Sequence, residues 1–311
     1  MFKYIKDLIE RLKTKDHSSA NSAYSVPATT DAETKPLSAE DIKQVLTDKS
    51  VETAPSQLRV AIGQSVGLER EHNEDSLFNL TANLSSNAST LLFGFYIVAD
   101  GMGGHLHGEI ASATAVRSMS EHVISKLYTP LFGLTPIIPE ESITEILESG
   151  IFKAHNAIVQ KTSGGGTTLT SLLILGKQMT IAHVGDSRIY QIEENGKLAA
   201  LTRDHSYVKR LEELGQITPE EAAVHPQRNV LYRALGQGDP FEPEIFTSPL
   251  PDSGYLLICS DGLWGVVPEL QIGKIVTESD DIYQAADLLI DTANAAGGPD
   301  NITAILIKLP N

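Results

Sequence analysis

The chain has 311 residues, of which 41% are hydrophobic, and a formal net charge of −16 at pH 7. This length fits one large domain or two small ones with a sizeable core. The acidic balance argues against nucleic acid as a partner, because phosphate backbones are bound by basic patches. The single cysteine, Cys259, lies in an apolar stretch. It cannot form an internal disulfide, and we expect it to be buried in a protein of the reducing cytosol.

The first 56 residues differ in composition from the rest of the chain. Residues 1–16 predict a basic amphipathic helix that docks on an anionic membrane or a partner protein, or packs on the domain's own surface. Residues 17–56 indicate a flexible linker, with a short helix predicted at 38–48. The start of the chain lacks the apolar block of a secretory signal. We therefore expect a cytoplasmic protein with, at most, peripheral membrane contact.

Residues 57–311 carry the patterns of a folded domain. Strands are predicted at 59–66, 91–99, 169–175, 179–184, 189–192, 197–201, 255–260 and 302–308. Helices are predicted at 109–127, 140–161, 207–214 and 282–295. We expect the first two strands to pair across a polar insert. Strands in consecutive groups, followed by blocks of helices, predict antiparallel sheets with helices outside, an α+β architecture rather than a doubly wound parallel sheet.

Four aspartates lie at or just after glycines, and three of them end short apolar runs. Asp100, Asp186 and Asp261 follow predicted strands, and Asp300 follows a Gly-Gly-Pro sequence. Each of these alone is also compatible with an ordinary turn. If the strand ends converge, however, the carboxylates repel one another unless a cation neutralises them. The pattern therefore predicts a site for hard divalent metal ions.

A charged cluster follows the first predicted strand. Arg70 lies four and five residues before Glu74 and Asp75. Such a cluster is compatible with a solvated loop. Its alternative interpretation adds the carboxylates to the metal site and gives Arg70 the planar fork that binds phosphate oxygens.

The order and spacing of these motifs resemble those of the metal-dependent PP2C-type (PPM) serine/threonine protein phosphatases, bacterial branch. The motifs are Arg70…Asn73-Glu74-Asp75, Asp100-Gly-Met-Gly-Gly-His105, Gly165-Gly-Thr167-Thr168, Val184-Gly-Asp-Ser-Arg188, Ser260-Asp-Gly262 and Asp300-Asn301. The bacterial features are Leu201-Thr-Arg-Asp-His-Ser206, Leu214-Gly-Gln-Ile-Thr218, His225-Pro226 and Asn229…Arg233-Ala-Leu-Gly236. The resemblance covers residues 59–308, and the ordered set is far more specific than any one motif.

The resemblance implies a four-layer αββα sandwich, two antiparallel sheets flanked by helices, with a binuclear metal centre at one end. It implies that Asp100 bridges both metals and that Asp261 and Asp300 complete one site. All-oxygen ligands suit Mn²⁺ or Mg²⁺ rather than zinc. The implied reaction is hydrolysis of phosphoserine or phosphothreonine on proteins by a metal-activated water, without a covalent enzyme intermediate.

The remaining implied roles fall on residues around this centre. Glu74 or Asp75, with the Gly101 carbonyl, serves the second metal, and the choice between the two carboxylates stays open. Asp186 helps to hold a weaker third metal. Arg70 binds the substrate phosphate and offsets charge on its oxygens.

One position departs from many eukaryotic members of the family. The chain has Met102 where they carry a histidine that is a candidate acid for the leaving alkoxide, and a thioether cannot donate a proton. His105 is the nearest replacement and His72 a second candidate. Both are also compatible with solvent-facing loop residues.

Residues 203–236 are expected to form the family's variable flap, which shapes the choice of protein substrate, or else an ordinary exposed helical hairpin. We expect a monomer that acts on phosphorylated protein substrates of a Ser/Thr kinase, without a nucleic-acid partner. Two alternatives remain at this point. One is a phosphatase dedicated to a regulator of the anti-anti-sigma type, and the other is a non-catalytic binding module that keeps all the metal aspartates.

Overall fold

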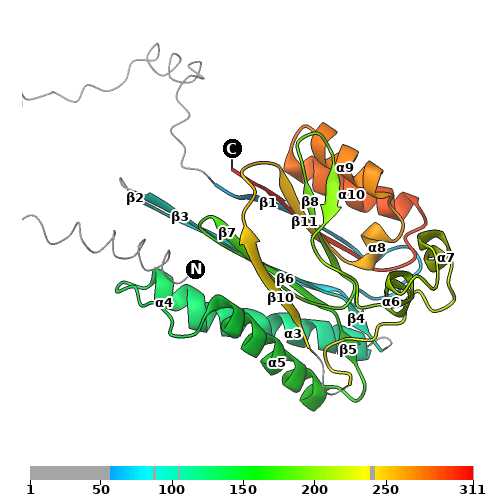
Figure 1. Cartoon of the computed structure of the whole chain (residues 1–311), viewed down its shortest axis with the longest axis horizontal. Helices are drawn as coiled ribbons and strands as arrows, with labels where there is room; N and C mark the ends of the chain where they lie inside the picture. The colour runs from blue at the N-terminus through cyan, green and yellow to red at the C-terminus, as the bar shows by residue number, and fades with distance from the viewer. Residues whose placement is uncertain (1–56, 87–88, 104–105, 239–241, 311) are drawn as a thin grey trace, which may run out of the picture. The chain divides into compact units, whose positions relative to one another are not determined.

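The computed structural model describes residues 57–86, 89–103, 106–238 and 242–310. Within them, two antiparallel sheets lie face to face with a layer of helices outside each sheet, the predicted αββα sandwich (Figure 1). The predicted helix at 1–16 and the linker at 17–56 lie outside the described residues. No helix in the described part of the chain is long and apolar enough to cross a membrane.

The first sheet has the strand order β1-β12-β11-β8-β9. Its strands are β1 (Arg59–Ser65), β12 (Ile302–Lys308), β11 (Tyr255–Cys259), β8 (Arg188–Ile192) and β9 (Leu198–Ala200). The second sheet has the order β10-β7-β6-β3-β2. It consists of β10 (Glu244–Pro249), β7 (Gln178–Val184), β6 (Leu169–Leu175), β3 (Ser89–Ala99) and β2 (Ser76–Ser86). A short ladder joins β4 (Gly101–Met102) to β5 (Gly166–Thr167).

The sheets bury apolar side chains on both faces, which explains why their central strands read as nearly continuous apolar runs. On β11, Leu256 and Ile258 face the core between the sheets. The alternate residues Leu257 and Cys259 pack against the outer helices. All four are fully buried, so the predicted burial of Cys259 is confirmed. Alternate side chains on a strand point to opposite faces, so one strand serves two cores.

Two helical layers cover the outer faces (Figure 1). Over the second sheet lie α3 (Leu106–Val123) and α5 (Ile143–Lys161), with a π-helical turn (Ile124–Tyr128) and α4 (Thr129–Phe132) after α3. The first sheet is covered by α8 (Asp261–Trp264), α9 (Glu269–Glu278) and α10 (Ile282–Ala295). Two further helices, α6 (Tyr207–Glu213) and α7 (Pro219–Ala223), belong to the predicted flap.

The predicted pairing of the first two strands is wrong. β1 pairs with β12, and β3 lies between β6 and β2, the second of which occupies the supposed polar insert. The missed strand does carry a period of two, because Phe78, Leu80, Ala82 and Leu84 alternate with polar residues. No sequence pattern predicted β10, α9 or the shorter elements β4, β5, α4, α7 and α8.

Candidate metal centre

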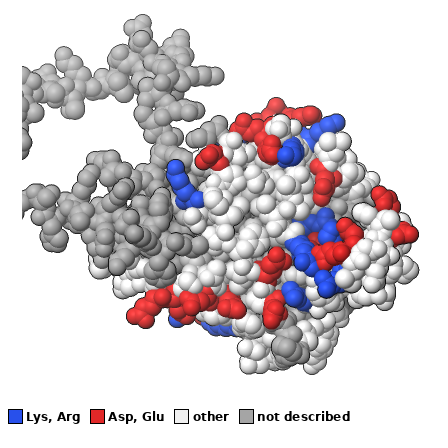
Figure 2. Space-filling view, in the orientation of Figure 1, with Lys and Arg blue, Asp and Glu red and all other residues white. Residues whose placement is uncertain are grey.

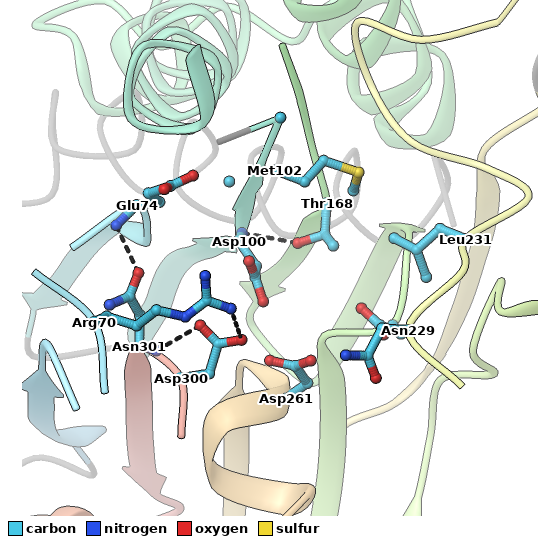
Figure 3. A pocket seen from close by; sticks show the side chains of 13 residues that line it. Arg70, Glu74, Asp100, Met102, Thr168, Asn229, Leu231, Asp261, Asp300 and Asn301 are labelled. Carbon is cyan, nitrogen blue, oxygen red and sulfur yellow. Dashed lines mark hydrogen bonds and ion pairs between the residues drawn. The ribbon is translucent and has the colours of Figure 1, made fainter. Parts of the chain in front are cut away.

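The predicted aspartates meet at one end of the sandwich. Asp100 follows β3, Asp186 follows β7, Asp261 follows β11, and Asp300 precedes β12. A cavity of about 250 Å³ opens between these strand ends. Its wall contains seven of the predicted residues, namely Arg70, Glu74, Asp100, Gly101, Asp186, Asp261 and Asp300. In Figure 3 the carboxylates of Asp100, Asp261 and Asp300 point into the same space.

Backbone hydrogen bonds fix Asp100 where it leaves β3. Its N–H donates to the Thr168 hydroxyl at 2.9 Å, and its carbonyl accepts from the Thr168 N–H at 2.9 Å. The Thr167 hydroxyl donates to the same carbonyl at 2.8 Å. Thr168 in turn contacts the Ser187 hydroxyl at 2.8 Å, beside Asp186. The Gly-Gly-Thr-Thr motif therefore sets the position of the Asp100 carboxylate.

The structure separates the two neighbouring carboxylates that the sequence left as alternatives. Glu74 lines the cavity, where its carboxylate lies so close to Gly108 that a Cβ there would collide with it. A Cβ at Gly101 would likewise collide with the Gly108 carbonyl oxygen. Asp75 lies behind the wall, where its Oδ2 accepts a hydrogen bond from the Ser260 hydroxyl at 2.8 Å. Glu74 is thus the carboxylate in contact with the cavity.

Asn301 organises the loop that carries Glu74, a role the sequence analysis did not assign. Its Oδ1 accepts from the Glu74 N–H at 2.7 Å (Figure 3). Its Nδ2 donates to the carbonyls of Val66 at 2.8 Å and His72 at 2.9 Å. Because Asn301 follows Asp300 directly, one side chain joins the Glu74 loop to the start of β12.

Burial raises the pKa values of the clustered carboxyl groups. Burial is the largest cause for Asp75, whose pKa rises to about 7, and for Asp261, whose pKa rises to about 6. The pKa values of Asp100 and Asp186 are raised well above the ordinary range, first by burial and then by neighbouring carboxylates, Asp75 for Asp100 and Asp261 for Asp186. Each carboxylate therefore disfavours the charge of the others, and a cation would relieve this repulsion.

Two buried carboxylate oxygens lack a hydrogen-bond partner within the described residues, Asp75 Oδ1 and Asp261 Oδ1. Buried polar atoms are usually satisfied, so carboxylate oxygens without a partner, in a cluster of carboxylates, suit the binding of a hard cation. No three His, Cys, Asp or Glu side chains of the described residues already stand in a metal-binding arrangement. The donor chemistry therefore fits hard cations, and binding them requires the carboxylates to adjust.

Arg70 and Asp300, predicted to bind phosphate and metal respectively, pair with each other here. Arg70 Nη2 donates to Asp300 Oδ2 at 2.7 Å, and Asp300 Oδ1 accepts from the Asn301 N–H at 2.8 Å. The Arg70 side chain is half exposed, which leaves its guanidinium accessible to a ligand in the cavity.

Three further residues line the cavity, namely Met102, Asn229 and Leu231, the last two from the predicted flap (Figure 3). No motif had pointed to Leu231. His105, the predicted acid, lies outside the described residues. His72 lies in the Arg70–Glu74 loop but not in the cavity wall.

Three comparisons with known proteins all indicate the same family. Residues 63–302 match the family model described as Protein phosphatase 2C. The serine/threonine phosphatase stp of Listeria monocytogenes is 37% identical over 250 residues, which cover 78% of this chain and 92% of that protein. The Mycobacterium tuberculosis serine/threonine phosphatase PstP/Ppp superposes with a TM-score of 0.67 at 32% identity, covering 82% of this chain and all of the other. A structure of the PstP catalytic domain in complex with two manganese ions gives a TM-score of 0.65 at 30% identity, covering 82% and 99% of the two chains.

The hydrogen bonds of Asn301 lead to a stability prediction. Asn301→Ala removes three bonds at a buried position and should lower the free energy of unfolding by about 3 kcal/mol. Urea denaturation with a fluorescence readout measures the change. Asn83→Ala, at an exposed position of β2, is the matched control and should change it by less than about 0.5 kcal/mol. Equal stability of the two variants would contradict the organising role of Asn301.

The raised pKa values lead to a pH prediction for the metal-free protein. In the folded protein the pKa of Asp75 is about 7 and that of Asp261 about 6, whereas both are 3.8 in the unfolded chain. The two groups therefore keep protons in the folded state at pH values where the unfolded chain has lost them. The free energy of unfolding therefore falls as the pH rises between about 4 and 7. The Tm of chelator-treated protein should be lower at about pH 8 than at about pH 5.5, and Mn²⁺ should raise it more at the higher pH. A Tm that rises over this range in chelator would contradict the shifts.

Proposed function

The chain belongs to the protein phosphatase 2C family and is a protein serine/threonine phosphatase, and from this premise we propose that its cavity binds two divalent cations for phosphomonoester hydrolysis. The non-catalytic alternative is not supported, because relatives that match most of this chain are named as phosphatases. The observation that carries the metal proposal is the set of carboxylates with raised pKa values around one cavity, of which Asp261 has an oxygen without a hydrogen-bond partner among the described residues.

We propose the following ligands for the cations. Asp100 would hold both cations, and Asp261 and Asp300 would complete one site. Glu74, with the Gly101 carbonyl, would complete the other; its place in the cavity wall supports Glu74 over Asp75. Asp75 then acts from behind the wall through Ser260, which holds its carboxylate near Asp100 and Asp261.

Asp186 supports a weaker third site beside Asp261, because the charge of Asp261 is the largest electrostatic cause of its raised pKa after burial. The oxygen donor set suits Mn²⁺ and Mg²⁺ alike. When bound, adjacent divalent cations would supply charge that makes a water molecule acidic near neutral pH and offsets the charge on phosphoryl oxygens.

The protein's own groups bind and orient the phosphorylated residue. The Arg70 guanidinium can leave Asp300 and donate two parallel hydrogen bonds to phosphoryl oxygens. A cation held by Asp300 would compete with Arg70 for that carboxylate, which would leave the guanidinium free to bind a phosphoryl group. The leaving alkoxide needs a proton, and we propose His105 as its donor, with His72 second, because Met102 cannot serve.

The substrates are phosphoproteins, as in the family. We propose that a Ser/Thr kinase produces them, that the protein acts as a monomer in the cytoplasm, and that residues 1–16 dock on a membrane or a partner. The flap residues Asn229 and Leu231 in the cavity wall support a role of residues 203–236 in the choice of substrate.

Metal dependence tests the central part of this proposal. Chelation should abolish hydrolysis of p-nitrophenyl phosphate, and Mn²⁺ or Mg²⁺ should restore it. Asp261→Asn keeps the shape of the side chain but removes the charge that holds a hard cation, so kcat/KM should fall at least about 100-fold at fixed Mn²⁺.

The matched control is Asp252→Asn, at an exposed position on the loop before β11, which should keep full activity. Circular dichroism should show both variants folded, since the amide removes a buried charge that is unfavourable without metal. Full activity of the wild-type protein in excess chelator would refute the proposed metal chemistry.

The role of Arg70 leads to a separate kinetic prediction. If Arg70 binds phosphate equally in the ground state and the transition state, Arg70→Ala should raise KM about 10- to 100-fold and leave kcat largely intact. Arg117→Ala, at an exposed position on α3, is the control. A fall confined to kcat would mean that the contact forms mainly in the transition state.

The leaving-group acid is tested with two substrates of different leaving ability. p-Nitrophenolate leaves unaided near neutral pH, whereas an alkoxide needs a proton. His105→Ala should therefore slow hydrolysis of a phosphothreonine peptide about 10²–10⁴-fold and leave p-nitrophenyl phosphate nearly unaffected. His122→Ala, on α3 and outside the cavity wall, is the control and should leave both rates unchanged. Equal losses on both substrates would assign His105 to positioning instead.

A further inference from the structure

The beginning of the flap is held against the turn between β7 and β8 by the backbone and ring of His205. The His205 N–H donates to the Gly185 carbonyl at 2.7 Å, and the Gly185 N–H donates to His205 Nδ1 at 3.1 Å. Gly185 has a φ of 113°, and a Cβ there would press on Thr168, so glycine is required at this turn. The next residue along the chain is Asp186. The flap thus starts from the turn that carries one wall carboxylate.

A buried ion pair lies beside this contact. Arg188 makes two parallel hydrogen bonds to the Asp204 carboxylate, Nε to Oδ1 at 2.9 Å and Nη2 to Oδ2 at 2.7 Å. Its third nitrogen donates to the Tyr190 hydroxyl at 2.8 Å. The Asp204 side chain is 8% exposed and that of Arg188 21%. A bidentate pair at this depth holds two segments in one geometry, which exposed pairs do not.

Trp264 connects the same pair to the helix that carries Asp261. The Arg188 guanidinium carbon lies 3.5 Å from the centre of the Trp264 ring, a stacked cation–π contact. The indole N–H donates to the Asp186 carbonyl at 3.1 Å. Trp264 ends α8, the one-turn helix that begins with Asp261. Arg188 therefore contacts Asp204, at the first root of the flap (residues 204–206), and also Trp264. Trp264 in turn joins Asp186 to the helix that begins with Asp261.

The end of the flap is also attached next to a wall carboxylate. Leu235 exchanges backbone hydrogen bonds with Thr167, whose hydroxyl donates to the Asp100 carbonyl. The Gly236 N–H donates to Nδ1 of His155 at 3.2 Å. Both roots of the flap thus end on backbone segments that position the carboxylates.

We propose that Arg188, Asp204 and Trp264 form a positioning unit that couples the root of the flap to the two walls of the cavity carrying Asp186 and Asp261. Arg188 and Trp264 do not need to touch substrate or metal for this role. Loss of the Asp204 charge would leave a buried guanidinium without its bidentate partner, and the three segments it joins would loosen together. The proposal rests on the proposed function only where it concerns metal binding, because the coupling is a property of the metal-free protein.

Amide hydrogen exchange in chelator-treated protein tests the coupling directly. Asp204→Asn, which preserves shape, should accelerate exchange about tenfold or more in residues 181–190, 201–208 and 258–268 together, and leave β6 unchanged. Acceleration confined to 201–208 would overturn the proposal, because it would show a flap that loosens without moving the walls.

Arg203→Gln is the matched control. It breaks the exposed ion pair of Arg203 with Glu213, one residue from Asp204. Glu213 also pairs with Arg210 on α6, and Figure 2 shows positive and negative side chains mixed on this face of the molecule. Exchange in 181–190 and 258–268 should stay within about twofold of the wild-type protein, because exposed pairs contribute little. Acceleration there equal to that of Asp204→Asn would contradict the special role of the buried pair.

Trp264→Phe tests the link through Trp264 separately from the link through Asp204. It also keeps the proposal testable if Asp204→Asn does not fold. Phenylalanine keeps an aromatic face under Arg188 but loses the N–H donor to the Asp186 carbonyl. Exchange should rise in 181–190 and 258–268, with 201–208 within about twofold of wild type. Unchanged exchange in 258–268 would overturn the link through Trp264.

A metal readout separates this proposal from the proposed function. In Asp204→Asn the Mn²⁺ concentration for half-maximal hydrolysis of p-nitrophenyl phosphate should rise about fivefold or more, with kcat at saturating Mn²⁺ within about twofold. A purely structural role would lower the Tm without this shift in Mn²⁺ dependence, and that result would overturn the proposal. If the wild-type protein needed no metal, the proposed function would fail while the exchange experiment still tested the coupling.

Discussion

Repulsion among carboxylates is the constraint on which the rest of the site depends. The ends of β3, β7 and β11 bring Asp100, Asp186 and Asp261 to one small cavity, and burial raises the pKa of each. Without a cation these groups cost free energy when charged, and they reduce that cost by retaining protons. The rigid sandwich, buried on both faces of its central strands, supplies the stability that lets a protein keep such a cluster. The raised pKa values of the cluster and its affinity for hard cations are therefore two consequences of one arrangement.

Neutral side chains do most of the positioning around this cluster. Thr168 holds the backbone of Asp100, Ser260 holds Asp75, and Asn301 joins the Glu74 loop to β12. These groups add hydrogen bonds without adding charge, so they fix the carboxylates without changing the net charge that attracts a cation. The flap is attached to the same segments at both of its roots, which places its inner residues in the cavity wall.

The sequence predicted the layers and most cavity residues because both depend on local patterns. Apolar runs that end at Asp100 or Asp261 identify buried strands together with the carboxylates mounted at their ends. Strand partners were not predictable in this way, since β1 pairs with β12, which lies more than 200 residues further along the chain. The strand β2 was not recognised because its alternating apolar residues lie in an Asn- and Ser-rich segment. The role of Asn301 depends on which backbone groups come within reach of its amide, and no local pattern encodes that.

Calorimetric titration of Mn²⁺ into chelator-stripped protein, repeated in buffers of different ionisation enthalpy, tests the central claim most directly. It counts the protons released when a cation binds. Because Asp75 and Asp261, with pKa values of about 7 and about 6, hold protons in part at pH 6.5, binding at that pH should release about one proton per protein, and the number should fall as the pH rises toward 8.5. Asp261→Asn should reduce both the affinity and the release. Tight binding without proton release at the lower pH, or no binding at either pH, would contradict the account.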